Sequence, residues 1–178
     1  MPVPIGWVTR GPHPSHGQRR GVQPSSPWPA AILSPVTKLA NPKLHHIAIT
    51  VTDLDASMAW YQEVLDVSLL MEVPHPGGTG MLLTDEQQSL AIVLHRHDAN
   101  EKELFSEKRT GLDHVGFMVS SRAELEEWQG HLAAHGVVRS SEAASPLTQS
   151  PIVDEPYGSV LVFRDPDNIQ LEFVAPPA

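Results

Sequence analysis

The sequence contains no cysteine among its 178 residues. This absence excludes disulfide bonds and thiolate metal ligands, so any transition-metal site must use histidine and carboxylate side chains. The chain also has no apolar run near the roughly 20 residues that a bilayer crossing requires, and no hydrophobic secretory segment follows its N-terminus. We therefore expect a cytoplasmic protein without a membrane partner.

Acidic residues are missing from residues 1–43, which carry five Lys or Arg side chains. The same segment holds nine of the 17 prolines, and its lack of hydrophobic periodicity predicts a disordered extension. The remainder carries 7 basic and 21 acidic residues, so the whole chain has a net charge of −9. This acidic body argues against nucleic acid as a partner.

Regular structure is expected from Leu44 onward, in a domain over residues 44–176. A β-branched stretch over residues 44–51 predicts a strand, and Asp53 is the expected N-cap of the helix that follows. Apolar residues in that helix are spaced by about 4, 3 and 4 positions, as a buried helical face requires. Further strands are predicted over residues 67–73, 81–83 and 90–94, which completes a β-α-β-β-β module over residues 44–95.

The same order returns over residues 111–174, after a charged connector over residues 96–110. A strand over residues 112–119 precedes a helix that begins with the capping box Ser121–Glu124 and ends near Gly136. Strands are predicted at residues 137–138, 159–164 and 169–174, with an irregular loop over residues 141–155. A fixed offset of 68 residues aligns His46 with His114 and Trp60 with Trp128. The sequence therefore predicts an α+β fold of paired βαβββ modules.

The segment Arg164–Phe173 predicts a tight turn followed by an alternating strand. Glu172 lies on this strand among largely apolar neighbours, where a carboxylate needs a partner. The repeat offers His46 and His114, which occupy equivalent strand positions with small residues two places further along. Two imidazoles and one carboxylate suit a divalent transition metal with open coordination positions.

These segments together resemble the vicinal oxygen chelate superfamily, which groups glyoxalase I, extradiol dioxygenases, methylmalonyl-CoA epimerase and the fosfomycin- and bleomycin-resistance proteins. The resemblance rests on Leu44–Leu54, Gly111–Phe117 and the DPDN turn within Arg164–Phe173. It implies paired βαβββ modules whose mixed sheets curl around a cleft, and a metal held by His46, His114 and Glu172. It further implies a small-molecule substrate and a homodimer, with each site contained in one chain or shared between two.

Two positions depart from the patterns of particular relatives. Glyoxalase I has a second glutamate where this chain has Ile92 or Val93, and ring-cleaving dioxygenases have a tyrosine where this chain has Val162. The remaining donors favour Fe(II), with Mn(II), Zn(II) or Ni(II) as alternatives. We predict a metal-dependent enzyme, dioxygenase-like or lyase-like, acting on an oxygen-chelating substrate. The alternative is a metal-free or metal-assisted drug- or metabolite-binding resistance protein.

Further residues are candidates for lining the cleft. His95 and His97 stand beside the connector, where they could reach the mouth of the cleft, and Tyr157 is close in sequence to Val162. His45 should face away from His46. The remaining histidines of the two modules are predicted to lie on the surface: His75, His131 and His135.

Overall fold

The computed structural model describes residues 40–177, and Lys43–Ala178 forms one compact unit. The predicted extension over residues 1–43 lies almost entirely outside the described residues. Within residues 40–177, neither helix combines the length and the apolar character that a membrane crossing requires.

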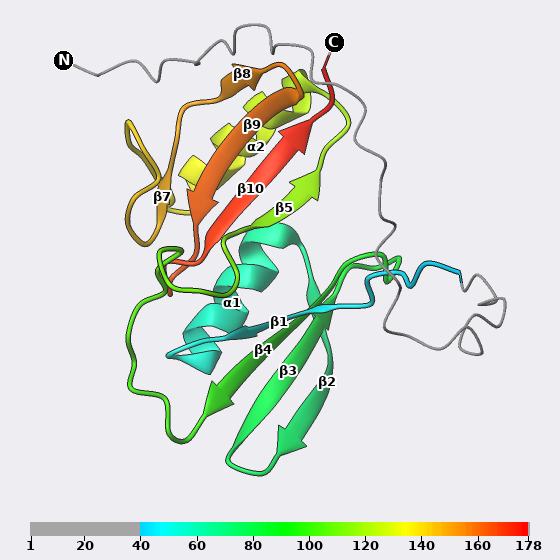
Figure 1. Cartoon of the computed structure of the whole chain (residues 1–178), viewed down its shortest axis with the longest axis vertical. Helices are drawn as coiled ribbons and strands as arrows, with labels where there is room; N and C mark the ends of the chain where they lie inside the picture. Colours follow the sequence, from blue (N-terminus) through cyan, green and yellow to red (C-terminus); the bar gives the residue numbers. More distant parts are fainter. Residues whose placement is uncertain (1–39, 178) are drawn as a thin grey trace, which may run out of the picture. The chain divides into compact units, whose positions relative to one another are not determined.

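The first module contains one helix and a four-stranded sheet (Figure 1). The sheet has the order β1-β4-β3-β2, with β1 parallel to β4 and the other pairs antiparallel. Asp53 caps α1 as predicted, because its carboxylate accepts a hydrogen bond of 3.0 Å from the backbone N–H of Ala56. The elements are β1 (Ile47–Thr50), α1 (Leu54–Leu65), β2 (Ser68–His75), β3 (Gly78–Thr84) and β4 (Ala91–His97).

The second module repeats this plan with a larger sheet of order β5-β10-β9-β7-β6, to which β8 adds by pairing with β9. The prediction of an irregular loop over residues 141–155 is wrong in part, since this stretch contains β7 and β8. Both strands are too short to show an alternating pattern. Pairing with β6 and β9 defines β7, and pairing with β9 defines β8. The elements are β5 (Val115–Met118), α2 (Arg122–Ala134), β6 (Val138–Arg139), β7 (Thr148–Gln149), β8 (Val153–Glu155), β9 (Gly158–Arg164) and β10 (Gln170–Ala175).

Capping residues also begin and end α2 as expected. The Ser121 hydroxyl accepts a hydrogen bond of 3.2 Å from the Glu124 backbone N–H. The Glu124 carboxylate accepts a hydrogen bond of 2.7 Å from the backbone N–H of Ser120. In a standard capping box the donor would be the backbone N–H of the N-cap residue itself, one position later. Gly136 follows the helix with a φ of +78°, a backbone conformation that favours glycine. The predicted α+β class is confirmed.

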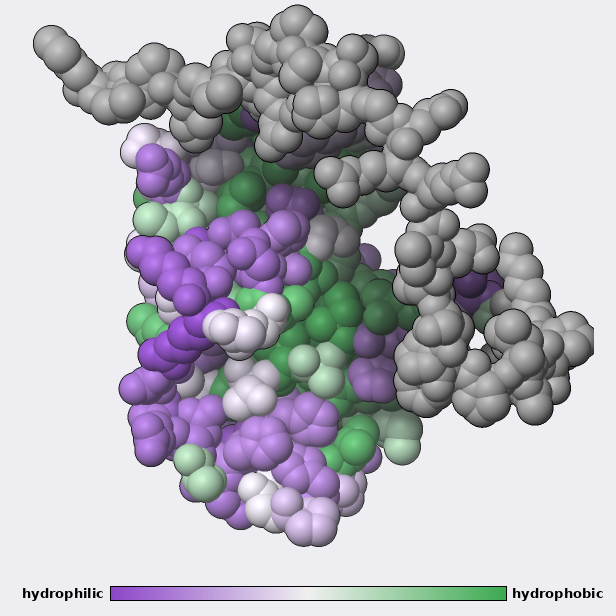
Figure 2. Space-filling view, viewed as in Figure 1, coloured by the Kyte–Doolittle hydropathy of each residue, from purple (hydrophilic) through white to green (hydrophobic). Residues whose placement is uncertain are grey.

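Each sheet has one face that packs into the core and one more exposed face, termed its open face, which is exposed at β1 and β5. Along β1, Ile49 is buried while Ala48 and Thr50 are exposed, and along β5, Val115 is buried while Gly116 and Met118 are exposed. The buried sides contribute to the hydrophobic core together with both helices. One face of the molecule shows an apolar area across its middle, bordered by hydrophilic residues (Figure 2).

The DPDN turn joins the two modules. Asp165 and Asp167 are both buried, at 0% and 3% exposure. Asp165 accepts a hydrogen bond of 2.9 Å from the Tyr61 hydroxyl, and Asp167 accepts one of 3.0 Å from the Ser57 hydroxyl. The two donors lie on α1, so a turn of the second module holds the helix of the first. The sequence predicts the turn, and the structure adds this second role.

Candidate functional site

His114 and Glu172 come together on the open face of the second sheet. His114 immediately precedes β5, and Glu172 lies on the neighbouring β10, where it pairs with Gly116. The distance from His114 Nε2 to Glu172 Oε1 is 3.4 Å. A Cβ on Gly116 would stand 3.1 Å from the same carboxylate oxygen, so the glycine leaves room for the Glu172 side chain.

Asp113 orients the His114 ring. Its carboxylate lies 2.7 Å from His114 Nδ1, so a proton on that nitrogen would be hydrogen-bonded to Asp113 and would leave a lone pair on Nε2. Nε2 is the ring nitrogen that lies beside Glu172. A carboxylate behind a histidine in this way is the usual support of a metal-binding imidazole.

His46 lies apart from this pair, directly before β1 in the first sheet. Its Nδ1 is 2.9 Å from Nδ1 of His45, and both side chains are exposed. Among residues 40–177, His46, His114 and Glu172 do not form a group whose donor atoms converge within one chain. The expectation that His45 faces away from His46 is wrong, since both residues precede β1 and the alternation of the strand does not apply to them.

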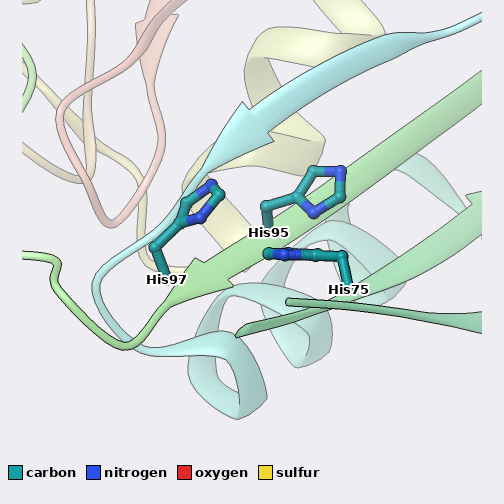
Figure 3. A group of neighbouring side chains, drawn as sticks. All are labelled: His75, His95 and His97. Carbon is teal, nitrogen blue, oxygen red and sulfur yellow. The ribbon is translucent and has the colours of Figure 1, made fainter. Parts of the chain in front are cut away.

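Three other histidines do converge in the first module. His75 ends β2, and His95 and His97 lie two residues apart on β4. Each offers a ring nitrogen, and the three nitrogens all lie within 4.8 Å of one another. The rings face a common space, as Figure 3 shows. The lining of the adjacent pocket, which has a volume of about 340 Å³, consists of these three histidines with Ala48, Thr50 and Val73.

Burial lowers the pKa of His95 below its ordinary value, and the neighbouring His75, His97 and His46 lower it further when they are protonated. The neutral form of His95 is therefore favoured. Neutral imidazole is the form that binds a metal ion or accepts a proton.

The predicted cleft residues have different outcomes. His95 lines the pocket with His97, whereas Tyr157 is 67% exposed in the turn between β8 and β9, away from the lining of this pocket. His75, predicted at the surface, is half-buried within the cluster. Its signal in the sequence is indirect: Gly78 and Gly80 on β3 leave space between the histidines of β2 and β4.

His131 also departs from the predicted surface position. It is half-buried on α2, and its Nε2 lies 3.0 Å from the carbonyl oxygen of Val64 on α1. This contact links the two helices, so we assign His131 a packing role. His135 is exposed, as predicted.

The strand register also identifies the position in this chain that corresponds to the second glutamate of glyoxalase I. In the second sheet, Glu172 pairs with Gly116, and in the first sheet, Ala48, the repeat equivalent of Gly116, pairs with Val93. Val93 is therefore the first-module counterpart of Glu172, and it offers no ligand.

A sequence profile of the Glyoxalase/Bleomycin resistance protein/Dioxygenase superfamily matches residues 43–173. This span covers the two modules, and the chain belongs to this superfamily. The resemblance drawn from the histidine strands and the DPDN turn is confirmed. A curated relative, the uncharacterized protein PA2024 of Pseudomonas aeruginosa, is 29% identical over 138 residues, which cover 75% of this chain and 88% of the relative.

Solved structures share the fold. A glyoxylase/bleomycin resistance protein/dioxygenase domain from Frankia sp. EAN1pec is 33% identical, with a TM-score of 0.67 over 78% of this chain and 100% of that domain. A point mutant of the fosfomycin resistance protein FosX from Listeria monocytogenes, complexed with Mn(II) and 1S,2S-dihydroxypropylphosphonic acid, is 20% identical, with a TM-score of 0.51. The match covers 76% of this chain and 93% of that protein. TnmS3, an antibiotic binding protein from Streptomyces sp. CB03234, is 16% identical, with a TM-score of 0.57. The match covers 79% of this chain and 100% of that protein.

Proposed function

We propose that the protein is a divalent-metal-dependent enzyme that acts on a small substrate bearing two neighbouring oxygens. The observation that carries this proposal is the pair formed by His114 and Glu172, 3.4 Å apart on an open sheet face. The superfamily includes metal-bound members such as the FosX complex with Mn(II). An imidazole and a carboxylate suit Fe(II) and Mn(II) alike.

The residues around the pair fit a metal. Asp113 contacts His114 Nδ1 and would orient the ring, and Gly116 provides the space in which Glu172 approaches it. The side chain of Glu172 is only 19% exposed, so its carboxylate is partly removed from water and would gain from a cation. The closeness of His114 and Glu172, two of the three predicted ligands, supports the proposal.

We infer that the third ligand is His46 of the partner subunit in a homodimer. His46 and His114 occupy equivalent positions of two sheets whose site-bearing faces are both uncovered in this chain. In such a dimer the open face of β1 in one copy would meet the open face of β5 and β10 in the other. Two-fold symmetry then gives two equivalent sites, each with His46 from one copy and His114 and Glu172 from the other. The exposed apolar side chain of Met118 on β5 suits such an interface.

The chain's own residues then bind and orient the substrate. A metal held by these ligands would supply Lewis-acid stabilisation of charge that develops on the substrate oxygens. Glu172 and His114 would set the direction from which the substrate approaches. The Asp113 carboxylate, 2.7 Å from His114 Nδ1, would hold the ring in the orientation that turns Nε2 toward the metal.

Metal analysis tests the proposal directly. Tag-free protein purified without chelator and reloaded with Fe(II) or Mn(II) should bind about one metal per chain at this site, and the variants His46→Ala, His114→Ala and Glu172→Gln should each lose it. His135→Ala, at the exposed C-cap of α2, is the matched control. Retention of this metal in both His114→Ala and Glu172→Gln would refute the enzyme proposal and favour a metal-free binding protein.

A mixing experiment tests the shared site. His46→Ala chains keep His114 and Glu172, while Glu172→Gln chains keep His46, so a mixed dimer contains one complete site. Unfolding and refolding the two variants together should restore about a quarter of an equivalent of metal per chain, the statistical yield for random pairing. If each site lies within one chain, the mixture will bind no more metal than the separate variants.

A further inference from the structure

The histidine cluster of the first module has a ligand geometry of its own. We propose that His75, His95 and His97 form a second metal site, which binds Zn(II) or a similar divalent transition ion on the open side of the first sheet. None of these residues belongs to the set His46, His114 and Glu172, so the site does not depend on the proposed function.

The strand register brings the three side chains together. His75 on β2 pairs with Gly78 on β3, and Gly78 pairs in turn with His97 on β4. Gly80, two residues further along β3, pairs with His95. The middle strand therefore carries glycine wherever a histidine lies beside it, and imidazoles from the outer strands can meet above it.

The glycines leave the histidine rings room at these positions. A Cβ on Gly80 would lie 2.8 Å from both Cε1 and Nδ1 of His95, and a Cβ on Gly78 would lie 2.8 Å from Cε1 of His75. These distances are shorter than van der Waals contact, so alanine at position 80 would displace the His95 ring. Alanine at position 78 would also meet the Arg96 carbonyl oxygen and would disturb the β4 backbone. The β3 backbone thus forms a floor for the His75 and His95 rings.

Two ring nitrogens in the cluster lack a partner. His75 Nε2 and His95 Nδ1 are buried and accept or donate no hydrogen bond within the described structure. His75 Nδ1 lies 3.2 Å from the Pro76 carbonyl oxygen, and donation to that oxygen would leave the lone pair on Nε2 free. Buried polar atoms are normally paired, so unpaired nitrogens facing a shared space indicate a ligand.

The donor set favours a transition metal. Among the side chains that line the pocket, none is a carboxylate, and three neutral imidazoles suit Zn(II), Cu(II) or Ni(II) better than Mg(II) or Ca(II). Ligand nitrogens around tetrahedral Zn(II) lie about 3.3 Å apart, given bonds of about 2.0 Å. The present separations of up to 4.8 Å close by small rotations of the rings, and the exposed His97 has the most freedom to move. The pocket leaves room for water in the fourth position.

Zinc titration in a background without the first site tests this inference. The double variant His114→Ala/Glu172→Gln, made in full-length tag-free protein, should bind one Zn(II) per chain in competition with a chromophoric chelator. Adding His75→Ala or His97→Ala should weaken this binding by at least about 100-fold, since loss of a direct ligand exceeds the 10–100-fold effect of losing its support. Adding His135→Ala, the matched control, should leave it unchanged.

The outcomes separate the two proposals. If the double variant binds one Zn(II) and the His97 variant does not, the three-histidine site stands whether or not the first site binds metal. If the double variant binds no Zn(II), or binds it equally well without His75 and without His97, the inference is overturned. X-ray absorption at the zinc edge gives a second measure, with about three imidazole nitrogens at about 2.0 Å expected. Circular dichroism melts confirm that each variant is folded.

Discussion

Asp165 has an unusual environment for a carboxyl group. It is fully buried and accepts hydrogen bonds from the Tyr61 hydroxyl and from the backbone N–H groups of Asp167 and Ile169, at 2.9, 2.9 and 2.8 Å. Burial raises the pKa of its carboxyl from the ordinary value of 3.8 to about 7, because the loss of water outweighs the hydrogen bonds that favour the charged form. Folding therefore favours the protonated form of Asp165.

This environment predicts a pH-dependent stability. Between about pH 4 and about pH 7 the unfolded chain releases the Asp165 proton while the folded chain keeps it, so the contribution to stability is lost as the pH rises. The free energy of unfolding of the native chain, relative to Asp165→Asn, should fall by up to about 1.4 kcal/mol per pH unit in this window. Asparagine retains the shape and can still accept both backbone hydrogen bonds. Urea unfolding of both proteins across this range measures the difference.

The control for this prediction is Asp98→Asn, at an exposed position. Its stability should follow the pH profile of the native chain. Parallel profiles for the native chain and Asp165→Asn would show that Asp165 is ionised in both folded and unfolded states.

The connector between β4 and β5, which begins after His97 and not at the predicted residue 96, is held to the second module by one arginine and the DPDN turn. Arg164 on β9 is buried and donates to Glu107, at 3.2 Å, and to the carbonyl oxygen of Ala143, at 2.6 Å. Asn168 adds a hydrogen bond of 3.0 Å to the carbonyl oxygen of Phe105. A segment with no hydrophobic periodicity is thus fixed by buried polar contacts.

Arg164→Met should therefore destabilise the protein by about 3 kcal/mol, since it leaves buried acceptors and the Glu107 carboxylate without their donor. Arg109→Met is the matched control. Its ion pair with Glu103 has a distance of 2.7 Å and both partners are more than half exposed, so its loss should cost less than about 1 kcal/mol. Thermal unfolding of the two variants gives the comparison, and equal losses would contradict the role of Arg164.

At the scale of the molecule, the open sheet faces are the main unexplained surface. Met118 on β5 is 85% exposed, and Leu70 and Met71 on β2 are each about half exposed, at 51% and 53%. Large apolar side chains on an uncovered sheet favour association. The proposed homodimer would cover this surface while it completes the metal site.

Met118→Glu should weaken this dimer at least about tenfold, because a charge buried at the interface costs well over the 1.4 kcal/mol that a tenfold change represents. The fold should survive, since the side chain contacts little within its own chain. Val138→Glu, at the β6 edge of the same sheet and 65% exposed, is the control. Sedimentation velocity at several concentrations measures both variants, and an unchanged dimer in Met118→Glu would exclude this face as the interface.

The helix starts, the DPDN turn and the two modules could be predicted from local sequence patterns. The caps Asp53 and Ser121 begin the two helices because their side chains satisfy backbone N–H groups a few residues away. Asn168 adopts a φ of +68°, in keeping with its place in the predicted turn. The 68-residue repeat predicted both modules, since matched strands and helices bury matched faces. The same alternation placed Glu172 opposite the buried side of β10.

Contacts between distant segments were decided by the tertiary structure. The short strand β7 is defined by its pairing with β6 and β9, and β8 by its pairing with β9. A stretch of two or three residues is too short for an alternating pattern to predict either strand. His75 and His97 are 22 positions apart in the sequence, and strand pairing through Gly78 brings them together. His114 and Glu172 meet because β5 and β10 are parallel neighbours, while His46 stays on another sheet. The sequence determines which side chains share a face of a strand, because the alternation of side chains is a local property. Which ligands then meet depends on strand pairing, and strand pairing joins segments that are far apart in the sequence.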